Sequence, residues 1–437
     1  MRRLDTTIGT RLRTGSVLFA LLSLTSVAAQ PAAVPPPPVS LDVPGRTDAT
    51  PSVAASGSFV AVAWGASGGG KADVFLAVSR DAGATFGAPV QVNPLAGDAR
   101  LGGELPPRVA LVARRRDAVP EVVVLWTARA ESTAIKLVRS RDGGKTFTAR
   151  STLQSPDTAG DRGWPALAVD TTANAHAIWL DHRGLAANRA TGAGQPAHQA
   201  GAAHDGVAMA QKSGLYYASV TTKALPERLL TNGVCYCCKT ALAAGPNGSL
   251  YAAWRHVYPG NLRDMAFTMS RDGGRSFSAP VRVSEDGWAI NGCPDDGPAI
   301  AVDPRGTAHL VWPTVITGAT PEGALFYAST RDGRQFTPRI RIPTLGGPKP
   351  SHPQIVMDRG GRTFVAWDEA VNGARVSAVR ELRLQSGRAP AFGDAVMLAP
   401  NGPATYPVLA ATDKGLVAVW ATGGDASRVE VRLLPMR

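Results

Sequence analysis

The chain has 437 residues, a formal net charge of +12 and 44% hydrophobic residues. Beyond its N-terminal region no apolar run has a transmembrane pattern, which argues against an integral membrane protein. The basic residues are spread along the chain without an aromatic-interleaved cluster, and no nucleotide or flavin motif is present, so nucleic-acid binding is excluded and the positive charge favours acidic partners such as anionic glycans.

The N-terminus has the features of a secretory signal. Arginines precede an apolar run over residues 17–22, and small residues lead up to Ala29. We therefore predict a signal peptide over residues 1–29, a stiff proline-rich tether over residues 30–38 and a single domain over residues 39–437. Such a protein is secreted or periplasmic, where its four cysteines meet oxidising conditions.

A repeated unit occupies the predicted domain. Each copy runs from Pro, or once Thr, through an alternating apolar strand and a turn to a second strand that ends in Trp. The seven copies are Pro51–Trp64, Pro107–Trp126, Pro165–Trp179, Thr240–Trp254, Pro298–Trp312, Pro353–Trp367 and Pro407–Trp420. Successive tryptophans are 62, 53, 75, 58, 55 and 53 residues apart, about the length of one four-stranded propeller blade with its loops. Helical periodicity is nearly absent, so we predict an all-β protein, a seven-bladed β-propeller of four-stranded blades.

The two ends of this domain are predicted to share one blade. After Trp420 only Val429–Leu433 reads as a convincing strand, so the last blade lacks a fourth. Val39–Val43 is an apolar segment at the other end of the domain. We predict that it completes the last blade and closes the ring. In the first repeat, the four predicted strands cover residues 52–55, 59–64, 74–79 and 89–92.

A second motif, Ser-x-Asp-x-Gly-x-Ser/Thr-Phe, recurs downstream of the tryptophans. Its copies are Ser79–Phe86, Ser140–Phe147 and Ser270–Phe277, with a shortened fourth at Thr330–Phe336. The Asp can accept backbone hydrogen bonds within a turn, and Gly supplies the positive φ that the turn needs. Strand counting places these turns between the third and fourth strands, on the bottom face. The loops before each Pro and after each Trp then share the opposite, top face.

The motif resembles the Asp-box, or BNR repeat, of the sialidase superfamily. Sialidase propellers have six blades, which makes six the alternative, although the seven repeats favour seven. The resemblance implies an exported protein that binds, and in the enzymatic case hydrolyses, an anionic glycan at its top face as an exo-sialidase type glycoside hydrolase, without a cofactor. Whether this chain is an enzyme stays open, because Asp-boxes also occur in propellers that are not sialidases.

Sialidases use three arginines to clamp the sugar carboxylate, a Tyr activated by Glu as nucleophile and an Asp as acid/base; an arginine fork suits carboxylate binding. The resemblance assigns these roles here by position in the top-face loops. The clamp would be Arg46, Arg162 and Arg255, the nucleophile Tyr406, its partner Glu369 and the acid Asp48.

The cysteines form a separate candidate site. Cys235, Cys237 and Cys238 precede the fourth repeat and Cys293 precedes the fifth, with Cys235 and Cys293 each five residues before the start of a repeat. All four are therefore expected in one patch of the top face. Two interpretations remain open: a disulfide from Cys293 to one of the other three, or a copper or zinc site completed by His256 or His352.

Two further alternatives follow. The chain could be a non-enzymatic binding module that works through its Cys/His metal or thiol chemistry, or a scaffold for protein partners. The long segment between the third repeat and its next strand, residues 180–214, is either a lid over the top face or a surface insertion. We expect a monomer, as is common for propellers of this size.

Overall fold

A computed structural model describes residue 9 and residues 37–114, 119–155, 159–186, 206–220, 226–290, 292, 294–385, 388–400 and 402–435. The predicted signal peptide lies outside the described residues except for Gly9. By its internal contacts the chain divides into Met1–Pro36 and Pro37–Arg437, and the fold described below belongs to the second unit.

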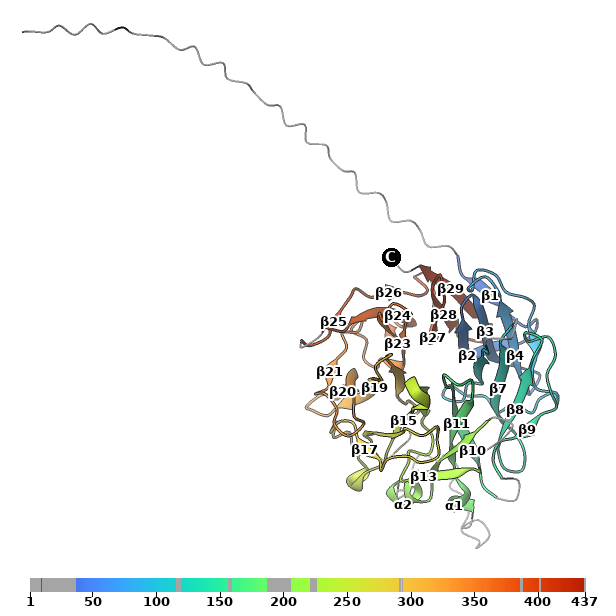
Figure 1. Ribbon diagram of the computed structural model, residues 1–437, viewed down its shortest axis with the longest axis horizontal. Helices are drawn as coiled ribbons and strands as arrows, with labels where there is room; N and C mark the ends of the chain where they lie inside the picture. The colour runs from blue at the N-terminus through green and yellow to red at the C-terminus, as the bar shows by residue number, and fades with distance from the viewer. Residues whose placement is uncertain are drawn as a thin grey trace, which may run out of the picture. The chain divides into compact units, whose positions relative to one another are not determined.

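This unit is a propeller of seven antiparallel sheets arranged in chain order around a central axis (Figure 1). The first three sheets are β2 (Thr47–Ser56), β3 (Phe59–Gly68), β4 (Lys71–Ser79) and β5 (Val90–Gln91); β6 (Arg108–Val112), β7 (Glu121–Ala128), β8 (Ala134–Ser140) and β9 (Ser151–Thr152); and β10 (Arg162–Val169), β11 (Ala175–Asp181), β12 (Gly214–Ser219) and β13 (Arg228–Asn232). The fourth and fifth are β14 (Ala241–Ala244), β15 (Leu250–Arg255), β16 (Met265–Ser270) and β17 (Val281–Arg282); and β18 (Ala299–Val302), β19 (Ala308–Ile316), β20 (Glu322–Thr330) and β21 (Ile340–Arg341). The sixth is β22 (Ser351–Met357), β23 (Thr363–Val371), β24 (Ala374–Arg383) and β25 (Ala391–Phe392), with β26 (Val396–Met397) also on β24, and the seventh is β1 (Val39–Leu41), β29 (Val429–Pro435), β28 (Gly415–Ala421) and β27 (Thr405–Ala411).

The seventh sheet joins the two ends of the unit, as the sequence predicted. Strand β1 pairs antiparallel with β29, with Val39 opposite Val431 and Leu41 opposite Val429. The two strands lie side by side in Figure 1. The seven-bladed prediction is confirmed, and six blades are excluded.

The strands run past the tryptophans that were predicted to end them. Trp64 lies inside β3, and Gly65 and Ala66 continue the pairing with β4 opposite Val74 and Asp73. The second strands are buried on both faces, as in β7, because each blade packs against a neighbour on either side. The hydrophobic core is therefore a ring of inter-blade clusters with the tryptophans inside it.

The repeated Ser-x-Asp motif forms the turns between third and fourth strands. In the first, the Asp81 carboxylate accepts hydrogen bonds from the Thr85 amide at 2.9 Å, the Thr85 hydroxyl at 2.6 Å and the Ser79 hydroxyl at 2.7 Å. Gly83, with φ of +91°, donates its amide to Ser79 Oγ. Antiparallel order puts these turns at the end of each blade opposite the starts of the first strands, as predicted.

Helix is almost absent from the described residues. Two short α-helices, α1 (Arg183–Ala186) and α2 (Gly206–Gln211), and the 3-10 turns Pro246–Gly248 and Pro259–Asn261 lie in loops. No described helix has the length and apolar character needed to cross a bilayer. The middle of the segment predicted as a lid or insertion, residues 187–205, lies outside the described residues.

Candidate active site

The carboxylates Asp48 and Glu369, predicted as catalytic, bind tryptophan indoles in the structure. Asp48 accepts the indole N–H of Trp64 at 2.8 Å, and Glu369 accepts that of Trp367 at 2.9 Å. Both carboxylates are fully buried, and burial is the main reason that the pKa of Asp48 is raised. Each carboxylate thus serves as the acceptor for the tryptophan indole of its blade, a contact that recurs in other blades of the propeller.

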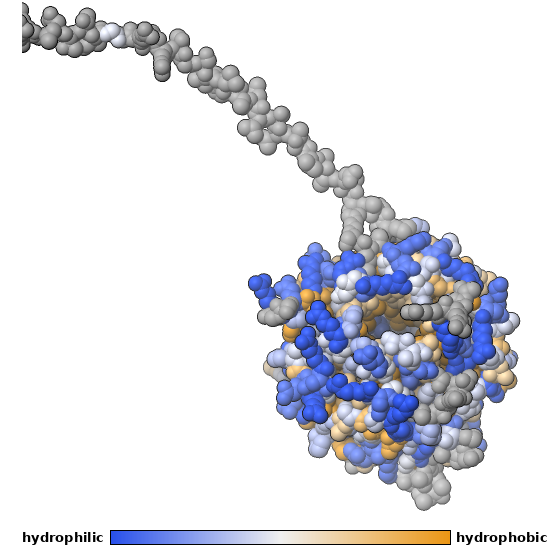
Figure 2. All heavy atoms as spheres, viewed as in Figure 1, coloured by the Kyte–Doolittle hydropathy of each residue, from blue (hydrophilic) through white to orange (hydrophobic). Residues whose placement is uncertain are grey.

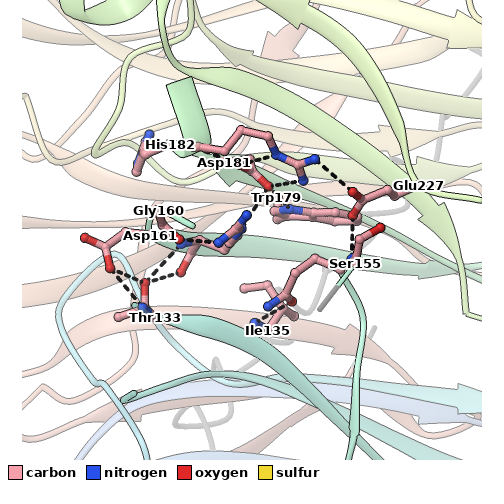
Figure 3. Close-up of polar contacts among 12 residues, drawn as sticks. Thr133, Ile135, Ser155, Gly160, Asp161, Trp179, Asp181, His182 and Glu227 are labelled. Atoms are coloured by element: carbon pink, nitrogen blue, oxygen red, sulfur yellow. Dashed lines mark hydrogen bonds and ion pairs between the residues drawn. The ribbon is translucent and has the colours of Figure 1, made fainter. Parts of the chain in front are cut away.

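The three arginines predicted as a carboxylate clamp bind separate partners. Arg46 pairs with Asp73 at 2.7 Å. Arg162 pairs with Asp181 at 3.1 Å, and Figure 3 shows this Asp181 beside Trp179, whose indole N–H it accepts. The buried Arg255 donates to the backbone carbonyls of residues 263, 296 and 313. None of the three lines the central pocket described below, so the structure does not assemble them there.

Four first strands begin with a bulge, and three of these bulges bring a side chain to that pocket. The pairing registers of β2, β10, β22 and β27 each shift where a residue precedes the proline of the repeat. These four residues have positive φ values of 49° to 54°, unusual for residues other than glycine: Thr50, Trp164, His352 and Tyr406. Backbone in such a conformation is strained, and strain of this kind gathers at functional sites.

Three of these residues, Trp164, His352 and Tyr406, line a pocket at the axis with a volume of about 560 Å³. Its walls come from five blades: the loop before β6, the starts of β10, β22 and β27, the loop before β18 and the strand β24. The lining residues are Gly102, Gly103, Glu104, Leu105, Trp164, Pro294, Asp295, Asp296, Lys349, Ser351, His352, Arg375 and Tyr406. The face of the unit seen in Figure 2 is covered mainly by hydrophilic side chains.

His352 occupies the centre of a polar network in this pocket. Its Nδ1 lies 2.9 and 2.8 Å from the two carboxylate oxygens of Asp368, which fixes Nδ1–H as the donor and leaves Nε2 3.7 Å from Glu104 Oε1. Arg375 donates its Nε–H to Asp368 Oδ1 at 2.8 Å. The ring of Tyr406 lies against the imidazole, with centroids 4.2 Å apart. The pocket thus holds, close to one another, a base (His352), a phenol (Tyr406), a carboxyl group besides Asp368 (Glu104) and a cation (Arg375).

The neighbouring charges tune these groups in opposite directions. Burial disfavours the charged imidazole, but Asp368, followed by Asp296 and Glu104, outweighs it and raises the pKa of His352. Burial, reinforced by Asp296, raises the pKa of Glu104 to about 7. Burial also raises the pKa of Tyr406, so its phenol stays protonated at neutral pH. Perturbed groups clustered in one pocket are typical of a catalytic site.

Of the residues predicted as catalytic, Tyr406 lines this pocket, and so does His352, which was predicted only as a possible metal ligand. Glu104, Asp296, Lys349 and Arg375 were not selected, because nothing in their own sequence context marks them. The position before each repeat's first residue would have indicated the axis, since it holds Trp164, His352 and Tyr406.

The cysteines form a second cluster. The sulfur atoms of Cys235, Cys237 and Cys238 lie within 4.8 Å of one another and all three are buried. Cys235 and Cys238 are free thiols with their Sγ atoms 2.9 Å apart, whereas Cys237 is disulfide-bonded. Cys293, the predicted disulfide partner, lies outside the described residues. His256 is not in the cluster; its Nδ1 accepts the indole N–H of Trp254 at 3.3 Å.

Burial raises the pKa of the Cys235 thiol, but a hydrogen bond from Cys238 and the charges of Arg263 and Arg255 outweigh it and lower the value to about 7. The pKa of Cys238 is raised, first by burial and then by its contact with Cys235. The pair therefore holds a single negative charge more readily than two.

No protein-family model matches this sequence, and no curated protein matches it. Among solved structures, a polysaccharide lyase of family PL25, an ulvan lyase, superposes with a TM-score of 0.59 at 9% identity over 91% of this chain and 96% of its own. A PL25 ulvan lyase bound to -[GlcA(1-4)Rha3S]- gives 0.59 at 8% identity over the same shares. The polysaccharide lyase Uly1 gives 0.51 at 11% identity over 90% of this chain and 91% of its own. These likenesses show a common propeller fold, and membership of the sialidase superfamily stays a prediction.

Proposed function

We propose that this chain is an exported enzyme that cleaves an acidic glycan in the central pocket by β-elimination beside a uronate carboxylate. One observation carries the proposal: His352, fixed through Nδ1 by Asp368, lies against the phenol of Tyr406 with Arg375 and Lys349 on the same pocket wall. Export rests on the predicted signal sequence.

Elimination from a uronate needs three groups, and the pocket offers each of them. A cation must stabilise the carboxylate as negative charge develops, which suits Arg375 and the exposed Lys349. A base must remove the proton from the carbon next to the carboxylate, which suits the free Nε2 of neutral His352. An acid must protonate the leaving glycosidic oxygen, which suits the neutral phenol of Tyr406.

The reaction balances without a cofactor. His352 takes the proton, and the electron pair of the broken C–H bond forms a carbon–carbon double bond within the uronate ring. The neighbouring C–O bond then breaks, and its oxygen takes the phenolic proton of Tyr406. Proton transfer from His352 back to Tyr406, through solvent, restores the site.

The neighbouring structures agree with an acidic glycan as substrate. All three reported structures are polysaccharide lyases, and one of them is bound to -[GlcA(1-4)Rha3S]-. At 8% to 11% identity they supply the choice of substrates to test first, and the assignment of roles rests on the pocket of this chain.

Hydrolysis is the second candidate, and the specific observation that favours it is the acid pair Glu104 and Asp296. The pKa of Glu104, raised to about 7, suits a general acid. A sialidase mechanism has less support, because Glu369, the group that would activate Tyr406, instead accepts hydrogen bonds from Trp367 and from the Gly347 amide at 2.7 Å.

Incubation with a panel of uronate-containing polysaccharides tests the proposal through the ultraviolet absorbance of the new conjugated double bond. Elimination predicts a rising absorbance that His352→Ala slows by roughly 100-fold or more. Asp413→Asn, which alters an exposed ion pair with Arg359, serves as the control and keeps the wild-type rate. New reducing ends without absorbance would establish hydrolysis instead. Binding without cleavage of any glycan in the panel would contradict an enzyme and favour a binding module.

A further inference from the structure

Two free thiols face each other in a part of the molecule that the proposed reaction does not use. Cys235 and Cys238, in the loop before β14, are 1% and 2% exposed, and their Sγ atoms are 2.9 Å apart. The Sγ of Cys237 lies 3.8 Å from that of Cys235, but its disulfide keeps it from acting as a thiolate. The cluster therefore offers two sulfur ligands.

Two buried arginines lie beside these thiols, and neither has an acidic partner among the described residues. Arg263 is 0% exposed and Arg255 is 1% exposed. Arg263 directs one N–H to Cys235 Sγ at 3.7 Å, and its other contacts are the Ile290 carbonyl and the Asn261 amide oxygen. Among the described residues, Arg255 donates to the backbone carbonyls of Asp296, Arg263 and Pro313. Neither forms an ion pair with a carboxylate in the described part of the chain.

Buried guanidinium groups are costly unless an anion balances their charge. No carboxylate of the described residues belongs to the sulfur cluster, so within it the thiols supply the negative charge. A pair of thiolates that shares one monovalent cation carries a net charge of −1. That charge is retained in the buried site, and the two arginines stabilise it.

The number and type of ligands select the metal. Zinc in proteins is held by four ligands, and among the described residues no His, Asp or Glu joins the sulfur cluster. Soft thiolates favour copper(I), for which two thiolates in a dry site form a complete coordination shell. We propose that Cys235 and Cys238 bind one copper(I) ion as a bis-thiolate, with Arg263 and Arg255 balancing its charge. Binding displaces to solvent the protons that the two thiols still carry, involves no change of oxidation state, and requires the two sulfurs to move apart around the ion.

The site adjoins the central pocket without sharing its chemistry. Cys238 directly precedes Lys239, whose amide N–H donates to Glu104 Oε2 at 3.3 Å. Arg255 donates its Nε–H to the Asp296 carbonyl at 3.1 Å. Metal binding is therefore expected to affect the residues of the pocket wall through these hydrogen bonds. The metal itself takes no part in the proposed reaction.

The test is an anaerobic copper(I) titration of the full-length protein, after mild reduction, against a chromogenic copper(I) chelator, followed by gel filtration and elemental analysis. The wild type is expected to retain one copper per chain. Cys235→Ser and Cys238→Ser, which preserve side-chain volume, should retain less than one tenth of that amount. His256→Gln, which changes the histidine first considered as a ligand, should retain it all. Thermal unfolding of each variant establishes that it is folded.

X-ray absorption at the copper edge supplies a readout that does not depend on the variants, and two sulfur scatterers without nitrogen are expected. Equal copper retention by the serine variants, zinc that displaces copper at equal concentration, or a nitrogen scatterer would each overturn the proposal. So would a disulfide between Cys235 and Cys238, identified by alkylation and mass spectrometry, in reduced protein that takes up no copper.

Discussion

Each repeated tryptophan buries an indole N–H that needs an acceptor, and the repeats supply it in two ways. In three blades the acceptor stands two residues after the tryptophan, as Asp181, His256 and Glu369. In three others it precedes the first residue of the repeat, as Asp48 at the start of β2 and as Asp98 and Asp286 in the loops before β6 and β18. Trp420 Nε1 has no partner among the described atoms.

Trp64→Phe and Trp420→Phe remove similar ring area from two blades but differ in one hydrogen bond. Trp64→Phe leaves the buried Asp48 without its indole donor, whereas Trp420→Phe removes a donor that has no partner in the described part of the chain. We expect the free energy of unfolding, measured in urea by circular dichroism, to fall by about 1–3 kcal/mol more for Trp64→Phe. Equal losses for the two variants would contradict a stabilising role for the indole contact.

The charge state of His352 can be measured without a substrate. NMR titration, with the resonance assigned by comparison with His352→Gln, is expected to give a pKa above the usual 6.5 because Asp368 and its acidic neighbours favour the imidazolium. Glu104→Gln removes one of these anions and should lower the pKa of His352, while Asp413→Asn should leave it unchanged. A histidine that titrates below 6.5, or that ignores Glu104→Gln, would show that the network is wrongly described.

The raised pKa of His352 also predicts how catalysis depends on pH. His352 must be neutral to accept a proton, so the rate of elimination should rise as the pH passes upward through the raised pKa of His352. In Glu104→Gln this acidic limb of the kcat/KM profile should move to lower pH. A limb that moves to higher pH would assign it to another group.

At the scale of single elements, the Ser-x-Asp turns and the bulged first strands have different roles. The Ser-x-Asp turns close the blades at one end of the sheets, and the bulges before each proline direct Trp164, His352 and Tyr406 into the pocket at the other end. The turn motif was recognisable from sequence because all its hydrogen bonds are local. The bulges were not, because the alternation of apolar residues predicts regular strands that begin at the proline.

The first Ser-x-Asp turn should weaken in acid. Hydrogen bonds from Thr85 and Ser79 lower the pKa of Asp81 to about 2, so its stabilisation is complete above the unfolded value of 3.8 and is lost as the pH falls toward 2. The difference in melting temperature between wild type and Asp81→Asn should therefore shrink over that interval. Asp425→Asn, an exposed side chain, provides the control. A constant difference would mean that the carboxylate charge does not stabilise the turn.

At the scale of the whole molecule, ring closure depends on three residues from the start of the described unit. Leu41 is 4% exposed and packs with Val429 and Val431 in the seventh blade. Leu41→Ala should lower the free energy of unfolding by about 2–5 kcal/mol. Leu95→Ala, at a leucine that is 53% exposed, should change it by less than about 0.5 kcal/mol. Similar effects of the two variants would contradict closure through β1.

Sequence reasoning reached the architecture because the seven proline-to-tryptophan repeats and the missing last strand are features of spacing alone. It reached the site only in part. Tyr406 stands in the pocket, but Arg375 comes from the third strand of the sixth blade, and Glu104 and Asp296 come from loops of different length. Convergence at the axis depends on blade geometry and side-chain direction, which no single repeat encodes. The sequence also does not distinguish an Asp or Glu whose carboxylate binds an indole from one whose carboxylate lines the pocket.

The central claim is that the Tyr406 hydroxyl transfers a proton in the axial pocket, and two adjacent glycines allow its most direct test. A methyl group on Gly103 would lie 2.3 Å from the Tyr406 hydroxyl, whereas one on Gly102 would meet only Leu105, at an ordinary 3.7 Å. The measurement is the initial rate of double-bond formation from a uronate polysaccharide. We predict that Gly103→Ala and Tyr406→Phe each lower this rate by roughly 100-fold while Gly102→Ala keeps the wild-type rate. A wild-type rate for Gly103→Ala and Tyr406→Phe would contradict the account.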